Sequence, residues 1–303
     1  MVWQRDGVPG IYPAASLAGW LCLPPLRGNG RAVGNVAKPA ALSSLRSAGI
    51  ADGWNCVAGH AQAAADVVSR HVVRVTSQKN GVSALGLQRV LGLGSYETAW
   101  TWLHKLRRAM VRPGRDGLSG EIEIDETYVG GPEEGKRGRQ TEDKAIVVVA
   151  AEKSGRGIGR IRLRRVADVS ADSLIPFVQA VAVPGSTIHT DGWGGYARVP
   201  TLGYQHQVTV ISGGSDPAHV VMPRVHNVAS LLKRWLMGTH QGGIQLQHLD
   251  YYLDEFTFRF NRRRSQARGL LFHRLVQQAV ASGPAPYHQI IAANDPAPAL
   301  EAT

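Results

Sequence analysis

Hydrophobic residues recur at two different periods along this chain, and the first of these periods is helical. Between residues 83 and 110 the apolar positions fall on one helical face, at Ala99, Leu103, Leu106 and Met110. Gly92-Leu93-Gly94 interrupts the pattern, and Ser95 after it is a good N-cap. The pattern predicts two helices joined by a glycine turn, which resembles a helix-turn-helix. An ordinary helical hairpin with a solvated basic face is the alternative.

The period changes after a linker rich in Gly and charge at residues 113–120. Residues 121–129 alternate like a strand, residues 144–151 are β-branched, and arginines alternate outward in residues 158–166. The elements expected after these three strands are a helix at 170–182, short strands at 186–190 and 207–211, and helices at 224–237, 246–260 and 270–281. This order predicts an α/β domain.

The pattern divides the chain into four segments. Residues 1–74 are rich in Gly, Ala, Pro and Ser, and we expect them to be poorly structured, although residues 58–73 could form a helix. Residues 75–118 form the helical segment, and residues 119–283 form the α/β domain. The Pro- and Ala-rich residues 284–303 are expected to be a disordered tail.

Composition and charge narrow the class of partner. The 303 residues carry a net charge of +11, and 44% of them are hydrophobic. The basic residues cluster at 160–165 and 259–268 within globular sequence, which favours a DNA or RNA backbone over a membrane. The sequence predicts no transmembrane helix and no signal peptide, so we expect a soluble cytoplasmic protein.

Two aspartates lie where a sheet could bring them together. Asp125 is on the strand 121–129, with Ile122 and Ile124 pointing to the opposite face, and Asp191 directly follows the strand 186–190. Two such carboxylates suit two-metal phosphoryl transfer with Mg²⁺ or Mn²⁺. Taken singly, each aspartate could equally be a strand-edge or turn residue.

The predicted helix at 224–237 adds a third group of candidates. His226, Ser230 and Lys233 fall at i, i+4 and i+7, so one helical face carries all three. Lys233, with Arg234 beside it, could hold a DNA phosphate or the terminal base near the metals. A solvated lysine and a structural histidine are the alternatives.

Further basic residues are candidates for DNA contacts. Lys105, Arg107 and Arg108 decorate the second helix of the predicted helix-turn-helix. Arg259, Arg262, Arg263 and Arg264 close the helix that begins near residue 246, and we expect phosphate contacts there rather than helix capping alone. On that helix Asp254 and Glu255 are runner-up metal ligands, with a salt-bridged helix face as the favoured alternative.

These pieces together resemble bacterial insertion-sequence transposases of the DDE superfamily, in the branch that joins a zinc ribbon to a ribonuclease-H-like catalytic domain (the fifteen-ninety-five group). The motifs that carry the resemblance are Ile124-Asp125-Glu126-Thr127-Tyr128-Val129-Gly130-Gly131, Thr190-Asp191-Gly192-Trp193, residues 226–236, Gly238-Thr239-His240, and Tyr252-Leu253-Asp254-Glu255-Phe256 running into residues 258–263.

The resemblance implies a mixed five-stranded sheet flanked by helices, and a reaction that cleaves element ends and transfers the strand into target DNA. It implies that Asp125, Asp191 and His226 hold two Mg²⁺ or Mn²⁺ ions, and that Lys233 is the lysine seven residues later. Since imidazole is a poor Mg²⁺ ligand, His226 is the position at which the resemblance is weakest. DNA and a homodimer or higher oligomer are the expected partners.

The zinc ribbon of that branch has no counterpart here. It needs paired Cys-x-x-Cys motifs, whereas Cys22 and Cys56 are the only cysteines, so we expect no zinc. One hypothesis is that residues before about 74 are translated out of the ancestral frame. The rival functions are a catalytically inactive, transposase-derived DNA-binding protein and a nuclease of the same fold that cleaves but never joins.

Overall fold

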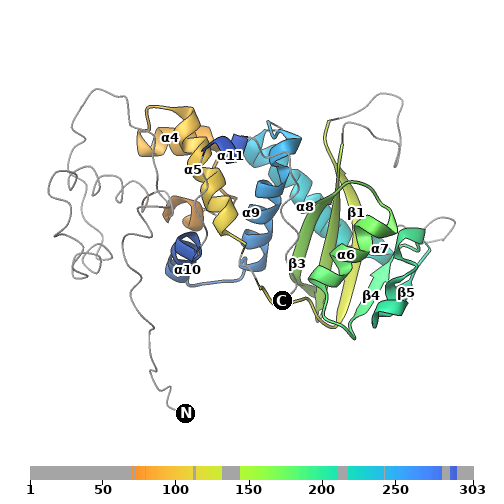
Figure 1. Cartoon of the computed structure of the whole chain (residues 1–303). Coiled ribbons are helices and arrows are strands. Elements are labelled where there is room, and N and C mark those ends of the chain that lie inside the picture. Colours follow the sequence, from red (N-terminus) through yellow and green to blue (C-terminus); the bar gives the residue numbers. More distant parts are fainter. Residues whose placement is uncertain are drawn as a thin grey trace, which may run out of the picture.

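The computed structural model describes residue 70 and residues 73–78, 80–111, 114–131, 144–210, 218–241, 243–281 and 287–291. Nearly all of the segment 1–74, the possible helix at 58–73 and most of the tail lie outside the described residues. A sheet-containing body and a helical body lie side by side (Figure 1). Of the helices described, none has the length and apolar character needed to cross a membrane.

The sheet is mixed and has five strands in the order β3-β2-β1-β4-β5. Its strands are β1 (Glu121–Val129), β2 (Ala145–Ser154), β3 (Gly157–Val166), β4 (Thr187–Thr190) and β5 (Gln205–Val208). The first three strands pair antiparallel, β4 joins β1 in parallel, and β5 joins β4 in parallel. This is the ribonuclease-H-like arrangement, so the prediction of an α/β fold with a mixed five-stranded sheet is confirmed. The last strand begins and ends earlier than the expected 207–211.

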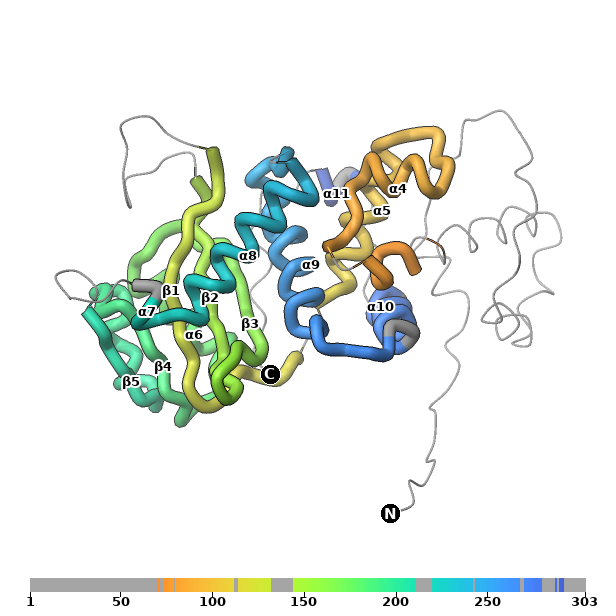
Figure 2. The backbone as a smooth tube through the Cα atoms, turned by 180° about the vertical axis from the view of Figure 1, so that it is seen from behind, coloured from red at the N-terminus to blue at the C-terminus, as the bar shows by residue number. Residues whose placement is uncertain are grey.

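One helix covers one face of the sheet, and two helices pack on the other, where α9 (Leu249–Asn261) lies against β3 (Figures 1 and 2). On one face α6 (Ala171–Val181) packs over the fully buried Ile122 and Ile124. On the other face α8 (Pro223–His240) packs over alternate residues of β2. Side chains at successive positions of a strand point to opposite faces, so Glu123 and Asp125 belong to the α8 face.

Glu123 shows how that face is fixed. Its carboxylate accepts hydrogen bonds from the backbone N–H groups of Arg224 (2.7 Å) and Val225 (3.0 Å), and it pairs with the guanidinium of Arg224 at 2.6 Å. An acidic side chain at a helix N-terminus satisfies donors that have no partner within the helix. The buried glutamate thereby anchors the first turn of α8 on β1.

The helical body contains α4 (Ala84–Leu91), α5 (Tyr96–Ala109), α9 (Leu249–Asn261) and α10 (Arg268–Ala281). Ser83 and Ser95 cap the first two helices, so the predicted hairpin with its glycine turn is confirmed. The hairpin shares one hydrophobic core with Phe258 of α9 and with Leu275 and Ala279 of α10. It is therefore built into the C-terminal helices and does not stand as a separate module.

Short elements complete the chain. They are the 3₁₀ helices η2 (Gly194–Tyr196), η3 (Val199–Leu202) and η4 (Leu246–His248), and the short helices α7 (Ala218–Val221) and α11 (Tyr287–Ile291). The helix expected at 246–260 begins as η4, and its α-helical part starts at Leu249.

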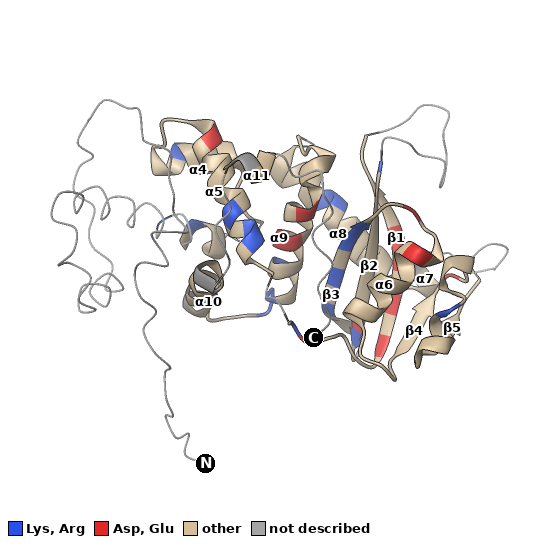
Figure 3. Cartoon of the chain, viewed as in Figure 1, with Lys and Arg blue, Asp and Glu red and all other residues tan. Residues whose placement is uncertain are grey.

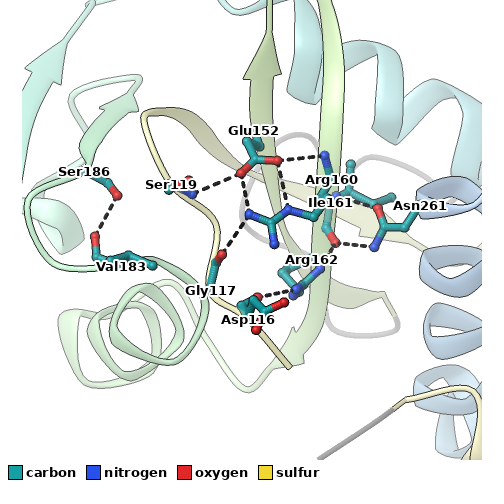
Figure 4. A network of polar contacts seen from close by, with 10 residues as sticks. All are labelled: Asp116, Gly117, Ser119, Glu152, Arg160, Ile161, Arg162, Val183, Ser186 and Asn261. Carbon is teal, nitrogen blue, oxygen red and sulfur yellow. Dashed lines mark hydrogen bonds and ion pairs between the residues drawn. The ribbon is translucent and has the colours of Figure 1, made fainter. Parts of the chain in front are cut away.

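A polar network joins the linker before β1 to β2 and β3 (Figure 4). Glu152 accepts hydrogen bonds from the backbone of Ser119 (3.1 Å) and from the guanidinium of Arg160 (2.7 Å). Burial alone would raise the pKa of Glu152, but these bonds lower it to about 2. Asn261 at the end of α9 bonds both backbone groups of Ile161, at 2.7 and 3.1 Å. The helical body is thereby attached to the edge strand β3.

Candidate active site

The register between β1 and β4 sets the positions of the two candidate aspartates. These parallel strands pair from Glu121 with Thr187 to Glu123 with His189. Asp125 on β1 and Asp191 directly after β4 each lie two residues beyond the last of these pairs. Neighbouring strands lie about 4.8 Å apart, so the register makes the two aspartates leave the sheet from adjacent strands, which is the arrangement that a shared cation needs.

The third candidate lies beside the first. His226 is in the first turn of α8, and its Nε2 atom is 3.6 Å from Oδ2 of Asp125. The two side chains are 30% and 17% exposed, so both are half-buried, and the Nε2 atom of His226 itself is buried against the sheet. The capping of α8 by Glu123, two residues before Asp125 on the same strand face, accounts for this closeness.

The turn after β4 holds Asp191 in place. The backbone N–H of Trp193 donates to Oδ1 of Asp191 at 3.0 Å. Gly192 between them has φ +84, a left-handed conformation that side chains disfavour. The indole Nε1 of Trp193 donates to the carbonyl of Val169 at 2.7 Å, which fixes the turn against the segment that precedes α6.

A buried tyrosine that no sequence pattern indicated also contacts the strand segment of Asp125. Tyr196 is fully buried, and its hydroxyl donates to the carboxylate of Glu126. Its pKa is raised well above the usual value, first by burial, then by Glu126, and then by the charges of Asp125 and Asp191. Both aspartates therefore lie within electrostatic reach of one phenol. The tyrosine five residues after Asp191 was a possible signal in the sequence.

Comparisons with known proteins agree with this geometry. Residues 117–261 match the family model described as an ISXO2-like transposase domain. These residues belong to the ISXO2-like transposase family. The match spans all five strands of the transposase domain and ends at the last residue of α9.

Two further searches add little to this assignment. The search of curated proteins gave no match. Among solved structures, the crystal structure of the Mos1 Strand Transfer Complex is similar at 11% identity over 72% of this chain and 78% of that chain, with a TM-score of 0.22.

Asp125, Asp191 and His226 are the side chains of the transposase domain that would bind the expected metal. Within the described residues, no group of three His, Cys, Asp or Glu side chains is already gathered as a metal cage. The carboxylates of Asp125 and Asp191 and the imidazole beside Asp125 are nevertheless oxygen and nitrogen donors of the kind that fit a divalent ion. Because imidazole is a softer ligand than carboxylate, the set fits Mn²⁺ better than Mg²⁺.

Two of the predicted phosphate-binding cations lie on the same helix as His226. Lys233 and Arg234 are exposed on α8, and within the described residues neither forms an ion pair. The pKa of Lys233 is lowered, first by partial burial and then by the charge of Lys144 at the start of β2. Two cations close together on the transposase domain make a favourable place for a phosphate.

Lys105 and Arg107 do not fit the expected DNA contacts. Helix α5 packs against α4, α9 and α10, and both side chains are buried, at 6% and 1% exposure. The Nε atom of Arg107 donates to Glu255 at 2.7 Å. The expectation of a basic recognition face was wrong for these two residues because α5 is the central helix of its body. Arg108 is exposed and stays a candidate.

The arginines at the end of α9 also bond to protein groups. Arg259 pairs with Glu255 at 2.7 Å and donates to two backbone carbonyls of the segment before α4. Arg262 and Arg263 lie over the rings of Phe258 and Phe260, and each donates to a carbonyl in the last turn of the helix. Arg262 and Arg263 therefore cap the end of α9, which was the alternative to phosphate contact. The prediction of a phosphate contact is wrong for Arg259.

Three predicted site residues remain, namely Arg264 and the two acidic residues of α9. Arg264 is exposed and stays a candidate for DNA contact. Glu255 is buried between Arg107 and Arg259, so it belongs to the salt-bridged helix face and not to a metal site. Asp254 lies one residue earlier on the same helix, and burial raises its pKa to about 8 against the opposing charge of Arg115.

Proposed function

We propose that this chain is a DNA transposase that cleaves insertion-sequence ends and joins them to target DNA at a site formed by Asp125, Asp191 and His226. The observation that carries the proposal is the parallel β1–β4 pairing, which ends two residues before both aspartates, within a domain of the transposase family. The closeness of His226 to Asp125 supports the third position.

Asp125 and Asp191 would hold two divalent ions, with His226 as a further ligand to one of them. When bound, such ions activate the attacking oxygen and stabilise the leaving oxygen in phosphoryl transfer. The protein's own contribution is to hold the carboxylates still. The backbone N–H of Glu126 donates to Oδ1 of Asp125 at 2.8 Å, as that of Trp193 does to Asp191. Ligands held in this way need little rearrangement when a cation binds.

Lys233 would bind a DNA phosphate close to the cleaved bond, with Arg234 on the next position of the helix. Arg108 and Arg264 are the remaining exposed candidates for the path of the duplex, at the helical body. Contacts to phosphate fix the orientation of DNA without reading its sequence. They would set the strand across the part of the sheet body where Asp125 and His226 are half-buried.

The helical segment 75–118 is proposed to support DNA binding together with the C-terminal helices, since it shares their core. The transposase domain is proposed to span 119–283. The prediction of a disordered tail at 284–303 is wrong for α11, which packs against α5 with Ile290 buried. A homodimer or higher oligomer on DNA, no zinc, and action in the bacterial cytoplasm at the nucleoid complete the proposal.

The experiment that tests it uses the full chain and DNA carrying the inverted repeats that flank its gene. Mn²⁺-dependent nicking at the repeat ends, followed by joining to a target plasmid, is expected from the wild type. Asp125→Asn and Asp191→Asn should abolish both steps and keep DNA binding. Asp172→Asn is the matched control, because that aspartate is 96% exposed on α6. Binding without cleavage would favour the inactive DNA-binding protein, and cleavage without joining would favour the nuclease.

A further inference from the structure

The ladder between β1 and β4 ends before it reaches the aspartates. Its last pair is Glu123 with His189, although β1 continues along β2 as far as Val129. Asp191 follows the last residue of β4 and lies two positions beyond that pair. The paired backbone therefore does not by itself keep Asp191 level with Asp125, and another contact has to connect the two segments.

Tyr196 makes such a contact on the α6 face of the sheet. It is the last residue of η2, the 3₁₀ turn that begins three residues after Asp191. Its hydroxyl donates to Glu126, whose backbone N–H donates to Asp125 at 2.8 Å. Glu126 thus touches Asp125 through its main chain and the Asp191 segment through its side chain.

The segment that carries Tyr196 is rigidly held. Gly195 packs so closely that a Cβ atom there would lie 2.7 Å from the carbonyl of Val169 and 2.8 Å from Leu174. Backbone atoms at that distance cannot move aside cheaply, so the turn is confined. Trp193 adds its hydrogen bond to the same carbonyl of Val169. Because the ring of Tyr196 is fixed in this way, its hydrogen bond also fixes the carboxylate of Glu126.

We propose that Tyr196 is a positioning residue for the metal centre, and that its hydroxyl, acting through Glu126, keeps the Asp191 turn in register with Asp125. This inference rests on the proposed function, because it presumes that the two aspartates share divalent ions. It assigns Tyr196 and Glu126 a role on the face of the sheet opposite to the substrate. Neither residue would touch DNA or the ions.

The test measures Mn²⁺ binding to the full chain without DNA, from the electron paramagnetic resonance signal of the free ion. Tyr196→Phe removes one oxygen atom and keeps the ring in its core. We expect it to weaken Mn²⁺ binding by about tenfold or more, the range found when residues supporting metal ligands are changed. Thermal melting without metal checks that the variant is folded.

Tyr204→Phe is the matched control. Tyr204 is buried in the same hydrophobic core as Tyr196, and its hydroxyl donates to the carbonyl of Ala182 at 3.2 Å, away from the aspartates. We expect this variant to bind Mn²⁺ like the wild type. Glu126→Ala removes the acceptor of the Tyr196 hydrogen bond, and we expect it to weaken Mn²⁺ binding at least as much as Tyr196→Phe does.

Three results would overturn the inference while leaving the proposed function standing. They are an unchanged affinity in Tyr196→Phe, an equal loss in Tyr204→Phe, and an unchanged affinity in Glu126→Ala. If the wild type binds no Mn²⁺, or if Asp125→Asn and Asp191→Asn bind it as the wild type does, the proposed function fails and the inference fails with it.

Discussion

The Nε2 atom of His226 lies 3.6 Å from Oδ2 of Asp125, at the start of α8 and the middle of β1. Two residues before Asp125, the carboxylate of Glu123 caps the same helix turn and so fixes the distance between the two elements. A side chain held there can act with Asp125 on one cation. The identity of that side chain should then decide which cation the site prefers.

His226→Glu should shift the metal preference from Mn²⁺ toward Mg²⁺. A carboxylate is a harder ligand than imidazole and suits the smaller ion better. The measurement is the ratio of nicking rates in saturating Mg²⁺ and Mn²⁺, which we expect to rise by at least about tenfold if one ligand contact of about 1.4 kcal/mol is gained in Mg²⁺. An unchanged ratio in a folded variant would show that position 226 does not contact the ions.

Lys233→Ala should weaken DNA binding and reduce its dependence on salt. Loss of one phosphate contact lowers the slope of log affinity against log salt by about 1. Arg263→Ala is the control, because that guanidinium already bonds to the carbonyl of Phe260 at 2.8 Å. We expect its salt slope to equal that of the wild type. Equal slopes for all three proteins would remove Lys233 from the DNA path.

The basic residues show where sequence reasoning reached its limit. The strands and the glycine turn follow from local periodicity, which a single sequence contains. Whether an arginine faces DNA depends on what packs beside its helix. Arg107 is 148 residues from Glu255 in sequence, and nothing near Arg107 indicates that a buried carboxylate will pair with it.

Glu255→Gln should destabilise the helical body strongly. The side chains of Glu255 and Arg107 are 1% and 2% exposed, and breaking a buried pair costs about 3–5 kcal/mol. Glu121→Gln is the surface control, since its partner Lys153 is 41% exposed, and it should cost at most about 1 kcal/mol. The free energies of unfolding in urea provide the comparison, and similar values for the two variants would contradict this account of the helical body.

The same pair gives an acid dependence with a defined sign. Burial alone would raise the pKa of Glu255, but Arg259 and Arg107 overcome it and lower the pKa from 4.5 to about 2. The stabilisation is therefore complete above pH 4.5 and is lost as the pH falls toward 2. The difference in stability between wild type and Glu255→Gln should shrink over that interval. A difference that stays constant would place the effect in packing and not in charge.

Asp254→Asn should stabilise the protein in neutral and basic solution. Burial raises the pKa of Asp254 from 3.8 to about 8, so folding retains a proton that the unfolded chain releases. The contribution of Asp254 to the free energy of unfolding is fully present below pH 3.8 and is lost as the pH rises to 8. Thermal melting should show no gain for the variant near pH 4 and an increasing gain up to pH 8, whereas Asp172→Asn should show none. A gain independent of pH would contradict the ionisation argument.

Tyr196 marks a second limit of the sequence. The motif around Asp191 indicated a ligand, yet the role proposed for the tyrosine five residues later depends on a fold that returns it to β1. The hydrogen bond between Tyr196 and Glu126 joins residues 70 positions apart, across two strands that share only three paired positions. A local pattern carries no information about such a contact, whereas the assembled sheet shows it directly.

Cleavage of the polypeptide by bound Fe²⁺ tests the central claim most directly. With Fe²⁺ in place of Mn²⁺ and with ascorbate and peroxide, radicals formed at the bound ion cut the nearest backbone, and mass spectrometry locates the cuts. If Asp125 and Asp191 share a metal site beside His226, cuts should appear together near residues 125, 191 and 226, disappear with excess Mn²⁺, and be lost in Asp125→Asn. Cuts near only one of these segments, or cuts that persist in Asp125→Asn, would contradict the account.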